Sequence, residues 1–263
     1  MTYQFLDYEV KDGLAVLMLN RPAKLNSFTG EMLEEINTAL SEATKNPDVR
    51  AVLLSGRGRA FGAGQDLSER AVKPTGTPPN LGESLDQRYN PIVRQLRGME
   101  KPVVCAVNGV AAGAAANIAL ACDLVLAARS ARFIQPFCRL GLVPDAGGTW
   151  SLPRLVGRAR AMGMAMLGGD VSAEQAEQWG LIWKCVDDDA LMDEAMSLAK
   201  TLATQPTVGL GLIKRAINES HGNTLDEQLD LERDFQSIAC QTEDYGEGVS
   251  AFLEKRKPAF KGR

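Results

Sequence analysis

Residues 103–123 read Val103-Val-Cys-Ala-Val107-Asn-Gly-Val-Ala-Ala-Gly-Ala-Ala-Ala-Asn-Ile-Ala-Leu-Ala-Cys-Asp123, a change from an apolar run to very small side chains. The first five residues have the pattern of a strand buried on both faces. The residues after them predict a helix whose first N–H groups carry partial positive charge, where a developing oxyanion can bind. Close packing of a helix requires the same small residues, so this stretch alone supports both interpretations.

Three further apolar runs predict buried strands, at Leu14–Asn20, Ala51–Leu54 and Leu124–Leu126. Between the first two, apolar residues recur at helical spacing from Met32 to Ala43. Strands that alternate with helices pair in parallel and are joined by right-handed crossovers. The pattern therefore predicts an α/β fold.

Strand signals fade after about residue 157. Capping-box sequences at Ser172–Gln175 and Thr224–Glu227 predict helix starts, and a further helix is expected between Asp189 and Pro206. We expect a core over residues 1–190 and a helical C-terminal region over residues 191–263. Residues 71–82 are rich in proline, threonine and glycine and show no periodicity. This predicts a surface loop that is either a binding lid or a connector.

Composition excludes several classes of protein. The chain has 263 residues, 45% of them hydrophobic, and a net charge of −4, which argues against a surface for nucleic acid. Its five cysteines are odd in number and contain no Cys-x-x-Cys, so we expect no metal site and a reducing, cytoplasmic location. The start of the chain lacks the pattern of a signal peptide. Polar residues interrupt the apolar stretch Val103–Ala128, so no membrane association is expected.

The chain has a single histidine, His221, in a turn-like sequence. A Ser-His-Asp arrangement and a histidine-rich metal site are therefore not expected. No Gly-x-x-x-x-Gly-Lys-Ser/Thr sequence is present, which excludes the common nucleotide-binding loop.

Two more segments carry chemistry. Residues 56–67, Gly56-Arg-Gly-Arg-Ala-Phe-Gly-Ala-Gly-Gln-Asp-Leu67, follow a predicted strand, and their glycines suit either a tight turn or a backbone that approaches a ligand. Residues 133–150 place Asp145 among apolar residues and before a glycine pair. A carboxylate with few polar neighbours is a candidate general base, although a helix N-cap explains the same position.

In this order and spacing, the three segments resemble the enoyl-CoA hydratase/isomerase (crotonase) superfamily. The resemblance covers almost the whole chain, from Leu19–Ser27 to Phe252–Lys261. It implies a spiral of repeated ββα units with a C-terminal helical trimerisation region. It also implies a coenzyme A thioester as ligand, no separate cofactor, and a homotrimer or a dimer of trimers.

The resemblance also implies roles for single residues. The main-chain N–H groups of Gln65 and Ala114 would form an oxyanion hole for the thioester oxygen. Coenzyme A would lie along one set of residues, Ala23, Lys24, Ala63, Asp66 and Leu67, with Lys24 near a phosphate. Phe260 and Lys261, expected on a terminal helix, would approach the adenosine end.

Departures from the family pattern indicate the kind of reaction. Hydratases of this family use two glutamates, where this chain has Asn117 and Phe137. Neither residue transfers a proton, so Asp145 is the remaining candidate acid/base. One carboxylate suits proton removal at one carbon and its return at another. We expect Asn117, Phe137 and Trp150 to bind the substrate, and Phe137 and Trp150 also to shield its acyl group from water.

Four segments of the chain resemble one branch of the family: Phe61–Leu67, Asn90–Pro91, Leu140–Asp145 and Thr204–Lys214. That branch converts the ring-1,2-epoxide of phenylacetyl-CoA to an oxepin in bacterial phenylacetate degradation. That branch is also linked to double-bond shifts in unsaturated acyl-CoA intermediates. We therefore expect an acyl-CoA isomerase. Three alternatives stay open: a non-catalytic acyl-CoA-binding subunit of a partner enzyme such as a homologous hydratase, an enoyl-CoA hydratase that works through Asp145, and a dehalogenase-like nucleophile.

Overall fold

The computed structural model describes residues 3–70 and 80–263. Most of the expected loop at 71–82 lies outside the described residues. Its last two residues already belong to a helix, which runs over Leu81–Ser84.

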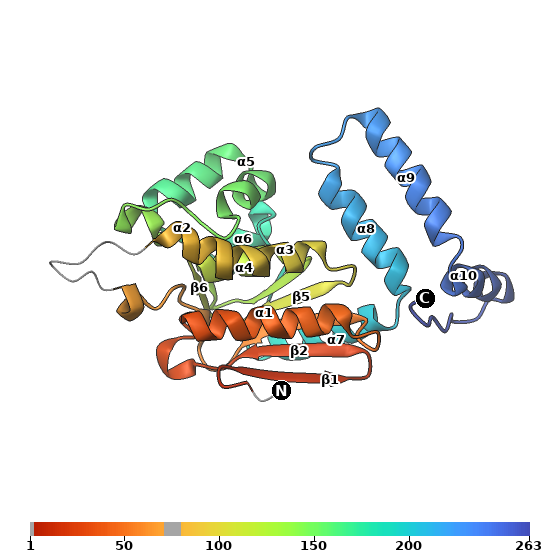
Figure 1. Ribbon diagram of the computed structural model, residues 1–263, viewed down its shortest axis with the longest axis horizontal. Helices are drawn as coiled ribbons and strands as arrows, with labels where there is room; N and C mark the ends of the chain where they lie inside the picture. The colour runs from red at the N-terminus through yellow and green to blue at the C-terminus, as the bar shows by residue number, and fades with distance from the viewer. Residues whose placement is uncertain (1–2, 71–79) are drawn as a thin grey trace.

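Two sheets form the centre of the molecule (Figure 1). The larger has the order β1-β2-β3-β5-β7-β10, and only its β1–β2 pair is antiparallel. Its strands are β1 (Leu6–Lys11), β2 (Leu14–Leu19), β3 (Ala51–Gly56), β5 (Val103–Val107), β7 (Leu124–Ala128) and β10 (Lys184–Val186). The smaller sheet has the order β4-β6-β8-β9. Its strands are β4 (Ala60–Gly62), β6 (Val110–Ala112), β8 (Arg132–Ile134) and β9 (Asp170–Ser172). The four apolar runs thus became β2, β3, β5 and β7, in parallel as predicted.

Three consecutive units of the chain repeat one pattern. In each, one strand joins the larger sheet, the next joins the smaller sheet, and a helix follows: β3 and β4 precede α3 (Asn90–Gly98), β5 and β6 precede α4 (Ala114–Leu120), and β7 and β8 precede α5 (Gly148–Leu167). The chain therefore advances along both sheets at once, as a spiral of ββα units. This confirms the predicted fold class.

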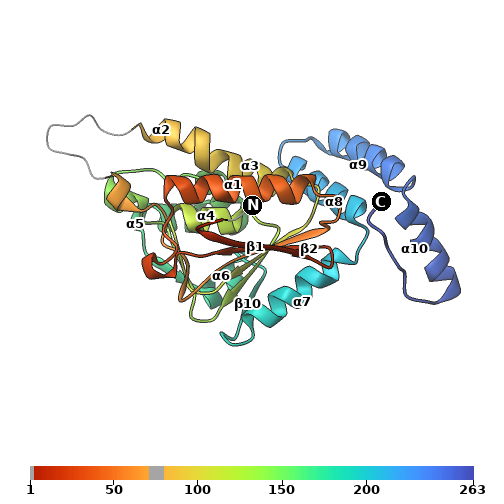
Figure 2. The ribbon, with the colours of Figure 1, turned by 60° about the horizontal axis from the view of Figure 1, so that its bottom comes forward.

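Helices cover both faces of the larger sheet. Figure 2 shows α1 (Gly30–Lys45) and α7 (Leu191–Ala203) on opposite sides of the first strands. The predicted apolar positions of α1 are buried, and its N-cap Thr29 accepts the Met32 N–H at 3.2 Å. The remaining helical segments are α2 (Leu81–Ser84), α6 (Ala173–Trp179), α8 (Thr207–Glu219), α9 (Leu225–Ala239), α10 (Glu243–Glu254), the 3₁₀ turns η1 (Pro22–Lys24), η2 (Leu67–Arg70) and η4 (Pro136–Leu140), and the π-helical turn η3 (Leu85–Tyr89).

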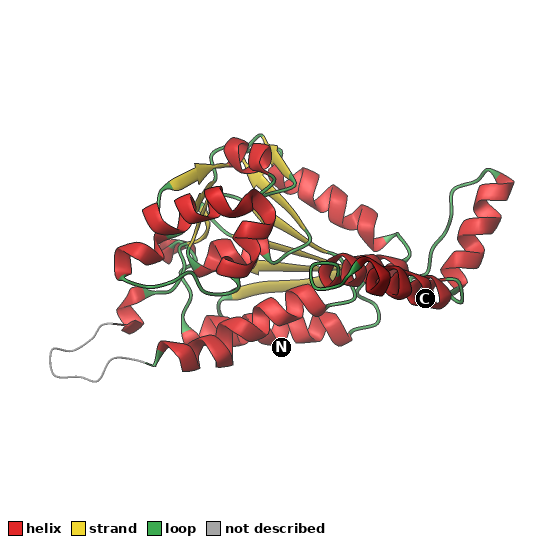
Figure 3. Cartoon of the chain, turned by 90° about the horizontal axis from the view of Figure 1, so that it is seen from above, coloured by secondary structure: helices red, strands yellow, loops and turns green. Residues whose placement is uncertain are grey.

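The C-terminal helices lie to one side of the body that holds the sheets (Figures 1 and 3). Helix α7 still packs on the larger sheet through buried residues of the core. The helices that lie to one side of the sheets therefore begin with α8, at Thr207. The Thr224–Glu227 capping box is present as predicted, and Ser172 caps α6. The last helices expose several large apolar side chains, Leu225, Leu229, Ile238, Phe252 and Leu253.

Across residues 3–70 and 80–263, no helix is both long enough and apolar enough to cross a membrane. The same residues contain no cluster of three or more histidine, cysteine or acidic side chains that would hold a metal ion.

The turn between β5 and β6 leaves no room for a side chain at Gly109. A Cβ there would lie 2.9 Å from the carbonyl carbon of Arg59 and nearer still to its oxygen. Because both atoms are backbone, Gly109→Ala should lower the free energy of unfolding by about 1–3 kcal/mol, measured by chemical denaturation. Gly98→Ala is the matched control, since a Cβ at Gly98 meets nothing within 4 Å. Equal stability of the two variants would contradict this description of the turn.

Candidate active site

The start of α4 meets the glycine-rich segment that follows β4. Gly64 has φ +82°, and a Cβ on it would lie 2.9 Å from the carbonyl oxygen of Ala112 and 3.9 Å from the main-chain nitrogen of Ala114. Gly113, the N-cap of α4, has φ +57°. Two glycines in the left-handed region therefore let these two backbone segments approach each other.

A short β-bridge fixes the direction of the Gln65 backbone. The Phe28 N–H donates to the carbonyl oxygen of Gly64 at 2.7 Å, and the Asp66 N–H donates to the carbonyl oxygen of Phe28 at 2.9 Å. In such a parallel bridge the residue between these two bonds points its own N–H to the opposite side. The Gln65 N–H therefore points away from Phe28.

Helix α4 packs closely through its small residues, and its first N–H groups remain the predicted binding point for an oxyanion. All seven of its residues are buried, and a Cβ on Gly62 would lie 2.7 Å from that of Ala115, so close packing requires small side chains. The first N–H groups of the helix have no acceptor within it. The Ala114 N–H is one of these, and it lies beside Gly64. The structure thus brings together the two main-chain segments that were predicted to hold the thioester oxygen.

Asn117 joins α4 to the segment that carries Asp145. Its Nδ2 donates to the main-chain oxygen of Asp145 at 2.8 Å, and its Oδ1 accepts from Nε2 of Gln135 at 2.8 Å. Asn117 is 1% exposed, so these bonds are shielded from water. Asp145 is half-buried and its Oδ1 is inaccessible to solvent. The N-cap of α5 is Gly147, so the alternative role of Asp145 as that cap is not what the structure shows.

Phe137 lies against the start of α4. Its ring comes within 3.6 Å of the position that a Cβ on Gly113 would occupy, and the residue is 7% exposed. An apolar ring therefore lies directly beside the N-cap of this helix. This is consistent with the predicted shielding from water.

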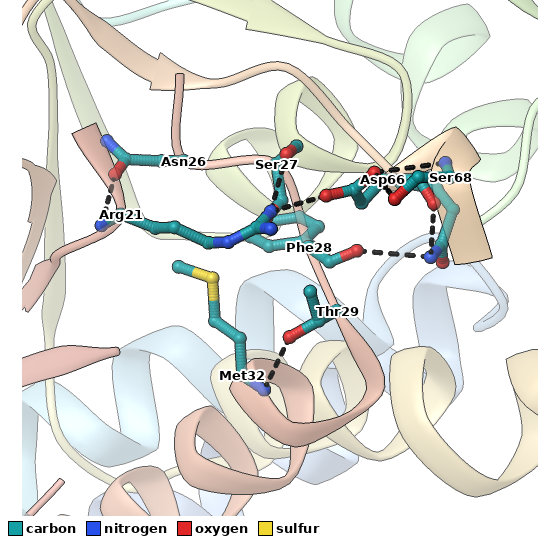
Figure 4. A network of polar contacts seen from close by, with 9 residues as sticks. Arg21, Asn26, Ser27, Phe28, Thr29, Met32, Asp66 and Ser68 are labelled. Carbon is teal, nitrogen blue, oxygen red and sulfur yellow. Dashed lines mark hydrogen bonds and ion pairs between the residues drawn. The ribbon is translucent and has the colours of Figure 1, made fainter. Parts of the chain in front are cut away.

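Arg21 and Asp66 connect the two segments predicted to lie along coenzyme A (Figure 4). An Nη1 of Arg21 lies 2.6 Å from Oδ2 of Asp66 and also donates to the main-chain and hydroxyl oxygens of Ser27. The hydroxyl of Ser68 and then the guanidinium of Arg21 hold the pKa of Asp66 well below its usual range. Asp66 is thus a partly buried anion that ties the loop after β2 to its own segment through Arg21.

Buried Asn26 supports the same loop. It has φ +51°, its Oδ1 accepts the Arg21 N–H at 2.8 Å, and its Nδ2 donates to the main-chain oxygens of Arg57 and Ala60 at 3.0 and 2.8 Å. These bonds bring the loop after β2 against the residues around β4. Ala23, Lys24 and Leu67 are exposed beside this junction, and the Ala63 N–H donates to the main-chain oxygen of Leu25 at 2.9 Å.

Trp150 is not brought to the start of α4. The guanidinium carbons of Arg97 and Arg154 lie 4.4 and 4.1 Å from a ring centre of its indole, and His221 meets it edge-on at 5.8 Å. Together they line a cavity of about 400 Å³ with Asp123, which follows the other end of α4. Trp150 therefore has its own cationic surroundings, away from the predicted oxyanion hole.

Phe260 and Lys261 also lie apart from the loop after β2. The expectation of a terminal helix there is wrong: α10 ends at Glu254, since Lys255 has φ +55°. The Lys261 N–H donates to Asp244 at 2.6 Å, and the Phe260 carbonyl accepts from Arg50. Figure 1 shows the C-terminus and the red loop after β2 at opposite ends of the molecule.

Sequence reasoning missed Arg21, Asn26 and Tyr89, although each contributes bonds to the site. Arg21 and Asn26 lie in the Leu19–Ser27 segment, but nothing in that segment indicates that they bind residues more than 30 positions away. The Tyr89 hydroxyl donates to Oε1 of Gln65 at 2.6 Å. A buried tyrosine needs such a partner, but its identity depends on the fold.

Comparison with known proteins identifies the family to which this chain belongs. The family model for enoyl-CoA hydratase/isomerase matches residues 9–263, and the chain belongs to that family. A solved enoyl-CoA hydratase from Polaromonas sp. JS666 is 35% identical, with a TM-score of 0.91 over 97% of this chain and 99% of that one.

Two curated relatives are enzymes of Escherichia coli (strain K12). The 1,2-epoxyphenylacetyl-CoA isomerase is 57% identical over 260 residues, 99% of each chain. The 2,3-dehydroadipyl-CoA hydratase is 37% identical over 248 residues, 94% of this chain and 95% of that protein. The family includes both isomerases and hydratases, so the residues of the site must distinguish between them.

The Arg21–Asp66 ion pair should make the free energy of unfolding depend on pH. Because the folded pKa of Asp66 is lowered, its contribution to stability is present above the ordinary aspartate pKa of about 3.9 and is lost as the pH falls further. Asp66→Asn should therefore reduce the free energy of unfolding at pH 7, with a difference from the native protein that shrinks between pH 5 and about pH 3.

The control is Asp86→Asn, because the Asp86 side chain is 75% exposed and lies 3.9 Å from Arg94. This variant should follow the native protein at every pH in denaturant titrations. A stability difference for Asp66→Asn that does not change with pH would contradict the assignment.

Proposed function

We propose that this protein is an acyl-CoA isomerase that converts ring-1,2-epoxyphenylacetyl-CoA to the oxepin-CoA and also shifts double bonds in unsaturated acyl-CoA intermediates. The observation that carries the proposal is the junction of Gly64 and Gln65 with the start of α4, beside the braced Asp145 segment. The relative at 57% identity supports the choice of substrate.

The two amides would act on the thioester carbonyl. As a proton leaves C2, negative charge develops on the carbonyl oxygen, and N–H groups already aimed at that position stabilise it without reorganisation. One such donor typically contributes about 2.7–4 kcal/mol to lowering the barrier. Because the donors are main-chain groups of Gln65 and Ala114, the backbone geometry decides the activity.

Asp145 would move the proton. It takes a proton at C2 and a proton is returned at another position, so the product is an isomer of the substrate and no cofactor is consumed. Coenzyme A belongs to the substrate. Asn117 occupies the position of one hydratase glutamate, and its side chain is engaged by Gln135 and the Asp145 backbone. Phe137 occupies the other position, so water addition by two carboxylates is not available here.

Coenzyme A would lie over the junction of the loop after β2 with the Ala63–Leu67 segment, with the exposed Lys24 near a phosphate. We propose a homotrimer or a dimer of trimers in the cytoplasm. The exposed apolar side chains of the last helices, among them Phe252 at 83% exposure, support such an assembly. In it, Phe260 and Lys261 would reach the adenosine end of coenzyme A on a neighbouring subunit.

Asp145→Asn tests the proposed chemistry. The substitution keeps the shape of the side chain but removes its basicity, so turnover of the epoxide should fall by at least about 10² while the Kd for phenylacetyl-CoA stays nearly the same. Product formation is followed by mass spectrometry and ultraviolet absorbance. Near-normal turnover in the variant would reject Asp145 as the base.

The native protein, tested alone, separates the alternatives. An isomerase should incorporate solvent deuterium at C2 of an unsaturated acyl-CoA and form no hydroxyacyl-CoA. Binding without exchange would instead indicate a non-catalytic subunit that supports a partner hydratase. Formation of hydroxyacyl-CoA would indicate a hydratase that uses Asp145 and a bound water.

A further inference from the structure

Tyr89 occupies an unusual place next to the site. It is the last residue of the π-helical turn η3, which joins α2 to α3. Tyr89 is 2% exposed, and its ring packs edge-on against Phe28 with 6.2 Å between ring centres. Single π-helical turns inside helices are frequent at functional sites. This turn directs a hydroxyl into the interior, where it must find a polar partner.

That partner is the side-chain amide of Gln65, whose oxygen and nitrogen both form hydrogen bonds. The Tyr89 hydroxyl donates to Oε1 of Gln65 at 2.6 Å, and Nε2 of Gln65 donates to the main-chain oxygen of Phe28 at 3.1 Å. Phe28 also makes the two main-chain bonds of the bridge around Gln65. The side chain and the backbone of Gln65 are therefore held against the same residue.

The π-helical turn is itself held from outside. Nδ2 of Asn37, in the middle of α1, donates to the main-chain oxygen of Arg88 at 2.8 Å. Oδ1 of Asn37 accepts from Nε2 of Gln95 in α3 at 3.0 Å. Hydrogen bonds thus hold the backbone of the turn to α1, and a separate hydrogen bond joins its last residue, Tyr89, to Gln65. All of these bonds are at least partly buried.

We propose that Tyr89 is a positioning residue of the oxyanion hole: its hydroxyl holds Gln65 so that the main-chain N–H points at the thioester oxygen. This inference rests on the proposed function, because it assumes that this N–H binds that oxygen. Oxyanion stabilisation depends on donors placed within hydrogen-bond distance before the reaction, so a small rotation of this peptide weakens it. Tyr89 acts through Gln65 and need not touch the substrate.

Tyr89→Phe tests the proposal, since it removes only the hydroxyl. The primary readout is the ¹³C chemical shift of the labelled thioester carbonyl in bound phenylacetyl-CoA, which reports polarisation of the C=O bond. In the variant, the shift on binding should fall by about half or more and kcat by about 10-fold to 10²-fold, with Kd changed less than about twofold. A Tyr89→Phe substitution in a Gln65→Leu background should have little further effect on kcat.

Tyr3→Phe is the matched control. The Tyr3 hydroxyl is also partly buried and donates to Oε2 of Glu42 at 2.9 Å, near the C-terminal end of α1. Its loss should leave the carbonyl shift and kcat unchanged. If Tyr89→Phe does not fold, Gln65→Leu alone removes the same side-chain bonds and should show the same reduced shift.

The outcomes separate this inference from the proposed function. If the native protein does not shift the carbonyl resonance, the oxyanion hole is absent, and the proposed function and this inference both fail. If the native protein shifts it and Tyr89→Phe shifts it equally with the same kcat, only the positioning role is overturned.

Discussion

The close approach of two backbone segments at Gly64 is the constraint on which the rest of the site depends. Any side chain at this position would overlap the Ala112 carbonyl and separate Gln65 from the first turn of α4. The spiral makes that approach possible, because β4 and β6 are neighbours in the smaller sheet and each leads directly into one of the two segments. The repeated unit therefore explains why the segments that carry the Gln65 and Ala114 amides lie next to each other.

Around this junction, polar side chains hold the backbone in place. Asn117 braces the Asp145 segment, Asn26 and Asp66 hold the loop after β2, and Tyr89 fixes the side chain of Gln65. The difference from a two-glutamate hydratase is therefore more than the loss of a carboxylate. At Asn117, an amide can donate to one neighbour and accept from another, which an ionised glutamate cannot do. That double role leaves Asp145 as the acid/base candidate.

The sequence predicted those parts of the fold that have long, clear patterns. The apolar run Val103–Val107 and the helical spacing in α1 are strong signals, and both elements formed where they were expected. The strands of the smaller sheet have only three residues each, which is too short for a period of two to be recognised. The pairing of Gln65 with Tyr89 joins residues 24 positions apart, so only the folded chain shows it. The surroundings of Trp150 were missed for the same reason, since His221 lies on a distant segment.

A crystal structure with an unreactive aryl-acetyl-CoA bound would show whether the two main-chain amides hold the thioester oxygen. We expect a thioester oxygen about 2.7–3.1 Å from the main-chain nitrogens of both Gln65 and Ala114, with the Asp145 carboxylate facing C2. A thioester oxygen bound elsewhere, or an Asp145 carboxylate turned away from C2, would contradict the mechanism while leaving the family assignment intact.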